Sequence, residues 1–543
     1  MASTEKFRKE PAVWLLLILW GLALSCMALP GTAQGAVSKS TTEIEVAPGE
    51  VITETQSVGE AVSGQASADD EGGGEGEMAP SHWPAKYGAI NEISYATAIA
   101  VDREHDAVYV AGRVNNSNST TGWDYLTIKY NFAGVEQWKK IYDGGANGFD
   151  EARAIATYTE NGQTYVYVTG YSTGNGTGAD IATIKYRDGG SVGYEVWTRR
   201  YLGSTVYEAA PTTDDYATAM IVDDQGNVYV TGATEGTGRG WDYVTIKYKP
   251  NGDIDQGWPR IYNHNPADPN MAGNRHDIPS AIALSSSSDP DGACVYVTGS
   301  SWRSATINGI VYQNYEYATV KYTTGGTLVR AKRYDGPGKG NDYASALAID
   351  DTNDVNNVYV TGSALGTTTG YDFVTGAYKP LGDWLWGGTG VQRHAGSSFD
   401  FAKGIGVANG FVYVTGLSFN DDSSANFTTI QYNAASQGGR NWTRTFDKAT
   451  LWDEPAGLVA KNDGVYVAGT TTGGTPSNNY TDGTARKYST GGDVIKRYNY
   501  NCAGDAGFTA LAVDDQGCLY VTGFSTDTRG GGNYKATTIR YNP

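Results

Sequence analysis

The sequence is poor in cysteine and histidine, and these shortages exclude several classes of protein. Only 4 of the 543 residues are cysteine and 5 are histidine. So few cysteines in so long a chain do not make a disulfide scaffold. No Cys-x-x-Cys pair, no Walker phosphate loop and no histidine spacing typical of a zinc site occurs. The sequence therefore lacks the familiar catalytic and metal-binding motifs.

Basic residues are outnumbered, which argues against nucleic-acid binding. The chain carries 40 Lys and Arg against 59 Asp and Glu, a net charge of −19. About half of this excess lies in residues 34–80, which hold ten acidic residues and one Lys, but the remainder is also acidic. An acidic body repels a phosphate backbone. We therefore expect no nucleic-acid partner.

Long hydrophobic runs are missing except near the start, where 1–33 is predicted to be a signal peptide. Basic residues precede an apolar run over 12–29, and the small residues Gly31 and Ala33 suit a cleavage site. Two alternatives stay open: an uncleaved membrane anchor, since the run approaches the length that spans a bilayer, and a lipoprotein attached at Cys26. We expect a secreted or cell-surface protein that meets the membrane only through this leader.

Residues 34–80 contain no Phe, Tyr or Trp and are rich in Glu, Ser, Thr and Gly. Such a segment cannot bury enough apolar surface to offset the entropy of ordering it. The sequence predicts a disordered acidic linker over 34–80, followed by a folded part over 81–543.

The folded part is organised around one short stretch, Val228-Tyr229-Val230-Thr231-Gly232, which recurs eight times with a period of 53 to 67 residues. In the third copy an apolar strand over 216–223 precedes it, and an alternating strand over 241–248 and a shorter one over 258–262 follow. Four antiparallel strands per repeat predict a β-propeller. The copies end at Gly112, Gly170, Gly232, Gly299, Gly362, Gly416, Gly469 and Gly523.

The two ends of the repeat region complete each other. The chain ends in a third strand over 537–541, and the folded part begins with a fourth strand over 83–87. We therefore predict an all-β fold, a propeller of eight four-stranded blades whose last blade is closed by the N-terminal strand. A ring of seven blades with one displaced unit is the alternative. Blade five departs most from the pattern, and its outer strand is the least certain.

The Val-Tyr-Val-Thr-Gly strand, the Asp-Gln-Gly-Asn turn before it and the Asp-Tyr-x-Thr-Ile-Lys-Tyr strand after it resemble the SBBP β-propeller repeat of secreted bacterial proteins. The resemblance extends over essentially all of 81–543. It implies a propeller fold and an extracellular setting, but no single activity and no catalytic residues.

Recurring residues are predicted to have structural roles. Aspartates precede the first and third strands of most repeats, where a carboxylate accepts backbone hydrogen bonds. Calcium binding is the alternative, and we otherwise expect no cofactor. The repeated Tyr and Trp are expected in the core, and the repeated Gly is expected where a Cβ would not fit. Cys502 and Cys518 flank a strand and are too far apart to bond, and Cys294 is expected to be buried.

Loops sort onto two faces because the strands alternate in direction. The first-to-second and third-to-fourth turns share one face, named here the turn face. The second-to-third loops and the links between blades share the other, named here the loop face. The longest excursions on the loop face, 202–214, 263–277 and 300–316, predict a ligand site in one sector. Its candidate residues are Tyr207, Glu208, His264, His276, Trp302, Arg303, Tyr312 and Tyr315.

These observations favour an extracellular binding or surface-display propeller without catalytic activity, expected as a monomer, with a glycan or an extracellular protein as partner. The alternative is a secreted carbohydrate-active lyase or hydrolase, for which Glu208 with Asp214 or Asp277 would be the first carboxylates to test. A purely structural component of a wall or matrix is a third reading. Fold alone does not choose among them.

Overall fold

The computed structural model describes residues 83–88, 92–116, 122–203, 213–236, 240–264, 276–307, 310–352, 355–396, 398–419, 424–435, 437–448, 452–475, 478–500, 502–528 and 533–543. The predicted leader (1–33) and acidic linker (34–80) lie outside these residues. In the described part of the chain, no helix has the length and apolar character needed to cross a membrane.

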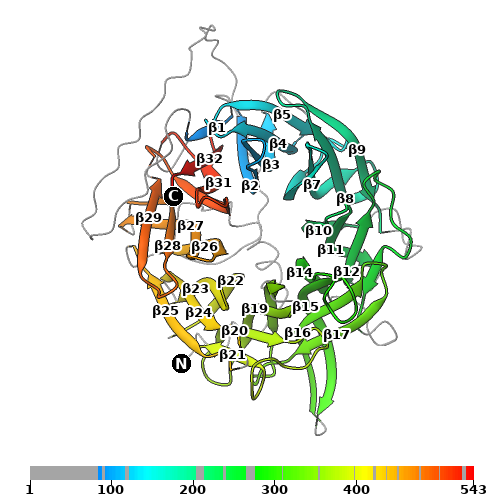
Figure 1. Cartoon of the computed structure of the whole chain (residues 1–543), viewed down its shortest axis with the longest axis vertical. Helices are drawn as coiled ribbons and strands as arrows, with labels where there is room; N and C mark the ends of the chain where they lie inside the picture. Colours follow the sequence, from blue (N-terminus) through cyan, green and yellow to red (C-terminus); the bar gives the residue numbers. More distant parts are fainter. Residues whose placement is uncertain are drawn as a thin grey trace, which may run out of the picture.

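Eight four-stranded antiparallel sheets surround a central axis, which confirms the predicted eight-bladed propeller (Figure 1). The first strand of each blade lies nearest the axis and the fourth lies outside. Blades 1 to 4 comprise β2 Glu92–Asp102, β3 Ala107–Asn116, β4 Asp124–Asn131 and β5 Glu136–Tyr142; β6 Asp150–Glu160, β7 Gln163–Gly174, β8 Gly178–Asp188 and β9 Gly193–Tyr201; β10 Asp215–Val222, β11 Val228–Gly236, β12 Gly240–Tyr248 and β13 Arg260–Tyr262; and β14 Asp277–Leu284, β15 Cys294–Ile307, β16 Ile310–Thr323 and β17 Leu328–Tyr334.

The remaining blades repeat the same order. Blades 5 to 8 comprise β18 Asp342–Asp350, β19 Asn357–Leu365, β20 Tyr371–Tyr378 and β21 Val391–His394; β22 Asp400–Ala408, β23 Phe411–Phe419, β24 Ala425–Asn433 and β25 Arg440–Phe446; β26 Asp453–Lys461, β27 Gly464–Thr475, β28 Asn478–Tyr488 and β29 Val494–Tyr500; and β30 Ala506–Val513, β31 Leu519–Ser525, β32 Lys535–Tyr541 and β1 Ala85–Tyr87.

Strand β1 closes the ring, as the unpaired terminal strands predicted. It pairs antiparallel with β32, with Ala85 opposite Thr538 and Tyr87 opposite Ala536. In Figure 1 the first strand of the chain accordingly lies beside the last. Closure removes the open seam that an incomplete eighth blade would otherwise leave.

The innermost strands share a β-bulge, and the recurring glycine makes room for it. In every blade the register between the first and second strands shifts by one residue, as between Ala217 and Ala219 in blade 3. Gly232 lies opposite this bulge, and a Cβ there would overlap the carbonyl oxygen of Tyr216. The glycine is therefore required by a close approach rather than by an unusual backbone angle.

Most blades are joined to the next by a pair of side chains that hold its third-to-fourth turn. The Trp197 indole N–H and the Lys185 ammonium both donate to the carbonyl oxygen of Pro250, each at 3.0 Å. Trp258 and Lys247 donate in the same way to Thr324 O at 3.2 Å. We name this arrangement the tryptophan clamp. It explains why Trp on the fourth strand and Lys on the third recur together.

Blade 5 keeps only the ring packing of the clamp, which its insertion provides, because no hydrogen bond from the Trp386 indole to a turn carbonyl is present. Its outer strand β21 has only four residues and pairs with β20, so the doubtful strand is present. Trp386 from the insertion is 1% exposed and packs on Tyr432 of blade 6 at 5.6 Å. This matches the stacking of Trp197 on Tyr248 at 5.8 Å.

The three cysteines of the folded part are free, as predicted. Cys294 and Cys518 are buried and Cys502 is half-buried. Cys294 is the small core residue that its place in the repeat indicated.

The closing strand gives the first prediction. Trp83 is 7% exposed, donates its indole N–H to Phe132 O at 3.1 Å and packs on Tyr130. We expect Trp83→Ala to lower the free energy of unfolding by about 3–5 kcal/mol, measured by denaturant unfolding. Lys86→Ala, at an exposed position of the same strand, is the control and is expected to change it by less than about 0.5 kcal/mol. An unchanged stability in Trp83→Ala would contradict closure through β1.

Candidate functional site

The aspartates that begin the first strands are structural, as the sequence predicted. Asp342 accepts backbone N–H bonds from Gly336 at 2.5 Å and from Leu365 at 3.0 Å. Asp150 likewise accepts from Gly144 and Thr173. Each carboxylate thus ties the link between blades to the end of the second strand on the loop face. Burial raises the pKa of Asp342 to about 7 because the charged form loses its hydration.

Carboxylates on the third strands pair with an arginine on the fourth. Asp180 bonds to Arg200 at 2.6 Å, and Glu316 bonds to Arg333 at 2.8 Å. Arg200 also reaches Tyr142 of the preceding blade at 3.3 Å. Arg333 likewise donates to Tyr262 of the preceding blade, so these arginines link the carboxylate of their own blade to the outer strand of the preceding one at the loop face.

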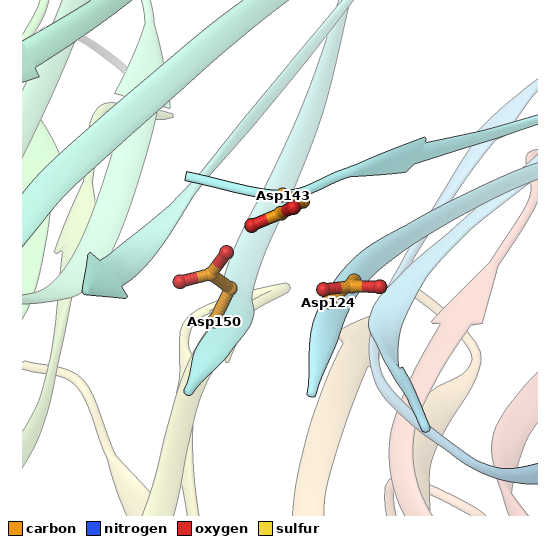
Figure 2. Close-up of side chains that lie close together, drawn as sticks. All are labelled: Asp124, Asp143 and Asp150. Carbon is orange, nitrogen blue, oxygen red and sulfur yellow. The ribbon is translucent and has the colours of Figure 1, made fainter. Parts of the chain in front are cut away.

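Blade 1 lacks this arginine, and three carboxylates converge there instead. Asp124, Asp143 and Asp150 have one carboxylate oxygen each within 4.8 Å of the others (Figure 2). Ile141 pairs with the residue two places after Asp124, just as Arg200 of blade 2 pairs with the residue two places after Asp180. Ile141 therefore occupies the position that Arg200 has in blade 2. Calcium takes about six to eight oxygen ligands, so three carboxylates alone do not define a calcium site.

Aromatic rings form a belt on the loop face, where first and third strands begin and second strands end. Neighbouring rings are 4.7 to 6.3 Å apart between centroids. The belt runs through most blades. This aromatic belt consists of Tyr95, Trp123, Phe149, Tyr171, Tyr216, Trp241, His276, Trp302, Tyr315, Tyr343, Tyr371, Phe399, Phe401, Phe419, Trp452, Phe524 and Tyr534.

A buried cation supports the belt at the junction of blades 1 and 2. The Arg113 guanidinium lies 4.7 Å from the centre of the Trp123 ring and 5.2 Å from that of Phe149. It also donates to Glu151 at 2.8 Å, and both side chains are nearly inaccessible. Here the belt is a packed structure rather than a surface.

Three of the predicted site residues belong to this belt. The predicted excursion over 300–316 is a long hairpin formed by β15 and β16, which extends past the outline of the ring (Figure 1). Trp302 faces Tyr315 across the hairpin with ring centres 5.0 Å apart, and Tyr315 packs on Tyr343 of blade 5. His276 packs edge-on against Trp241 and accepts its backbone N–H.

The other predicted residues are more dispersed. Arg303 pairs with Glu316 at 2.9 Å, and the His264 backbone N–H donates to Asp277 at 3.2 Å. Burial lowers the pKa of His264, and the nearby Arg333 lowers it further. Tyr312 lies farther out on the hairpin, opposite Ala305. Tyr207 and Glu208 lie outside the described residues, so a ligand site in this sector stays a prediction.

The most exposed rings of the belt lie elsewhere, in residues that sequence reasoning did not select. Phe399 is 38% exposed and Trp452 is 45% exposed, at the links that enter blades 6 and 7. These links are short, whereas the predicted ligand site was placed on the longest excursions of the loop face. The sequence does contain a sign of these exposed rings. An aromatic residue directly precedes the first-strand aspartate in both blades, Phe399 before Asp400 and Trp452 before Asp453.

Two serines, Ser172 and Ser191, have the Gly-x-Ser-x-Gly spacing of a hydrolase nucleophile elbow, so the expectation that familiar catalytic motifs are missing was wrong in this respect. Ser191 lies in the turn between β8 and β9 and not between a strand and a helix. Gly170-Tyr171-Ser172-Thr173-Gly174 reads Gly-x-Ser-x-Gly, but it lies within β7 instead of between a strand and a helix. Ser172 is buried, and its hydroxyl accepts a bond from Arg200 at 2.7 Å. This serine therefore has a structural role.

Comparison with known proteins agrees with the repeat and the fold. Residues 196–238 of this propeller, from β9 to the end of β11, match the SBBP beta-propeller repeat. None of the curated proteins compared with it matched.

Three solved structures resemble this propeller at low sequence identity. A rhamnogalacturonan lyase from Bacillus licheniformis is 11% identical, with 86% of this chain and 75% of that chain covered and a TM-score of 0.41. An alpha-L-arabinanase from Penicillium chrysogenum is 10% identical, with 86% and 97% covered and a TM-score of 0.35. The WD40 domain of SCAP from fission yeast is 9% identical, with 68% and 82% covered and a TM-score of 0.38. Likenesses this distant assign neither ligand nor activity.

The buried aspartates predict a pH dependence of stability. Burial raises the pKa of Asp215 and of Asp342 to about 7, whereas unfolded aspartate titrates near 3.8. Above about pH 4 the folded state therefore holds protons that the unfolded state has released, so this contribution to stability is lost as pH rises through about 7. We expect the melting temperature to fall between about pH 6 and pH 8, as followed by calorimetry.

Asp342→Asn is the control for this prediction, because it removes one titrating group and should make the decline shallower. Unfolded histidine titrates near pH 6.5, so His264 and His276, whose pKa burial lowers, oppose this decline only in the lower part of the window. A melting temperature that rises from pH 6 to pH 8 would be the contrary result.

The carboxylate cluster of blade 1 predicts a stabilising substitution. Ile141 is 49% exposed, so Ile141→Arg loses little apolar burial and places a guanidinium where Arg200 lies in blade 2. We expect a gain of about 1 kcal/mol, seen as a higher melting temperature in EDTA. Ile495→Arg, at another exposed isoleucine (42%), is the control without such a cluster. Equal effects of the two substitutions would count against this electrostatic account.

Proposed function

We propose that this protein is a non-enzymatic binding propeller that acts outside the cell and takes its ligand on the loop face. The observation that carries the proposal is the aromatic belt, which reaches the surface of that face at Phe399 and Trp452. Partly exposed aromatic rings beside a few polar groups are the usual make-up of sites for glycans and for protein partners. An extracellular setting agrees with the apolar leader and the acidic spacer of the sequence.

The enzymatic alternative has less support, because Asp214 and Asp277, two of the three carboxylates named for it, are engaged in holding the backbone. Asp277 accepts N–H bonds from His264 and from Trp302, the latter at 2.8 Å. Asp214 accepts the backbone N–H of Ala179 at 2.8 Å. A catalytic acid or base must be within reach of substrate, and these two carboxylates are turned to the chain itself.

The loop face is tested by attaching a bulky group to one face at a time. Thr368 is exposed in the second-to-third loop of blade 5, and Asn251 is exposed in a third-to-fourth turn. In a Cys502→Ser background, Thr368→Cys and Asn251→Cys are each coupled to a maleimide polyethylene glycol. Binding to insoluble polysaccharides and to cell-envelope preparations is then measured by co-sedimentation with the full chain.

We expect the unmodified chain to be retained by at least one of these materials, the conjugate at Thr368 to lose retention, and the conjugate at Asn251 to keep it. Soluble products are followed in the same tubes as new reducing ends and as absorbance of unsaturated uronides. Retention without products supports a binding propeller. Product release that is lost in Asp214→Asn or Glu208→Gln would establish the enzyme instead, and no retention by any material would refute the proposal.

A further inference from the structure

The junction of blades 6 and 7 differs from the other parts of the aromatic belt. Trp452 directly precedes the first strand of blade 7 and bridges Ala425, as Phe149 bridges Trp123 at the junction of blades 1 and 2. In five blades the residue at the place of Ala425 carries a ring, and these residues are Trp123, Trp241, Tyr315, Tyr371 and Tyr534.

We propose that Trp452, with Glu454 and Lys403, forms a binding site for a neutral pyranose saccharide; this inference rests on the proposed function and names its ligand. Ala425 has no ring to lay beside Trp452, and the indole is 45% exposed. It presents a flat apolar surface on the loop face.

The Trp452 indole is held in place by contacts from several sides. The Phe419 ring meets Trp452 edge-on at 5.1 Å, and the indole N–H donates to Glu454 Oε2 at 3.3 Å. The Trp452 carbonyl oxygen accepts the backbone N–H of Thr472 at 3.1 Å and its hydroxyl at 2.6 Å. A ring fixed before binding loses little conformational entropy when a ligand packs on it.

Two accessible polar side chains, Glu454 and Lys403, lie beside the Trp452 indole. Glu454 Oε1 accepts from Lys403 Nζ at 2.8 Å, and the two side chains are 21% and 25% exposed. A carboxylate accepts and an ammonium donates hydrogen bonds, so the pair suits neighbouring hydroxyl groups on one sugar ring. The corresponding glutamate of blade 2, Glu151, is only 2% exposed and is enclosed by Arg113 and Tyr171.

The charges favour a neutral ligand. Lys403 is already balanced by Glu454, so the pair offers no net positive charge to a uronate or a sulfate. The chain as a whole carries a net charge of −19, which repels polyanions. A neutral pyranose ring suits this combination of an exposed indole and a balanced ion pair. Its C–H face packs on the indole while its hydroxyls reach the ion pair.

The test measures binding of neutral hexasaccharides to the full chain by titration calorimetry. The probes are cellohexaose, laminarihexaose, maltohexaose, xylohexaose and mannohexaose, with an alginate hexamer as the anionic comparison. We expect at least one neutral probe to bind and the alginate hexamer to bind at least about ten times more weakly. Trp452→Ala is expected to weaken the neutral interaction by about tenfold or more, Glu454→Gln to weaken it less, and Trp452→Tyr to restore part of it.

Tyr194→Ala is the matched control, because Tyr194 is 47% exposed on the outer strand of blade 2 and should not change affinity. Melting curves of each variant confirm that the fold is kept. Binding of no neutral probe, preference for alginate, or full affinity in Trp452→Ala would overturn the inference. If a conjugate at Thr368 still abolishes retention on an envelope preparation while Trp452→Ala does not, the proposed function stands and only the saccharide site at Trp452 is wrong.

Discussion

The ring depends above all on the contact by which one blade holds the outer turn of the next. In the tryptophan clamp an indole N–H and a cationic or amide side chain converge on a single turn carbonyl. Trp442 and Gln431 do so on Thr490 O at 3.0 and 2.9 Å. At the closure Trp83 and Arg540 do so on Phe132 O, both at 3.1 Å. A buried carbonyl without a donor would cost more than such a bond gains, so each clamp fixes the distance between two blades.

At the loop face, different contacts hold neighbouring blades in place. Buried aspartates hold the links between blades, and carboxylate–arginine pairs join neighbouring outer strands. Because these groups are engaged with the chain, the face keeps its shape. The aromatic belt lies at this face and is most exposed at Phe399 and at Trp452, the latter beside the ringless Ala425. Positions at which one blade departs from the repeat, such as Ala425, therefore distinguish one part of this face from another.

Much of the fold followed from the repeat itself. The strand ending in Gly232 and its seven relatives predicted the blade number, and the incomplete repeats at the two ends predicted the closure through Trp83. The candidate site could be predicted only in part. The sequence pointed to the long hairpin that carries Trp302 and Tyr315, yet in the structure these rings pack against blade 5. Trp452 was not selected, because its neighbour across the bridge, Ala425, appears only in the structure.

The sequence by itself determined the eight blades, their four strands, the closing strand and the structural role of the aspartates, because each of these rests on partners within one repeat or on a pattern that returns in every repeat. Only the tertiary structure decided which side chains meet across blades. Arg486, at a position that is Ile128 in blade 1, is 8% exposed and lies 3.4 Å from the centre of the Phe446 ring. Burial there lowers its pKa to about 10. Such neighbours come from different repeats, and their contacts depend on how two sheets pack, which no local pattern of residues encodes.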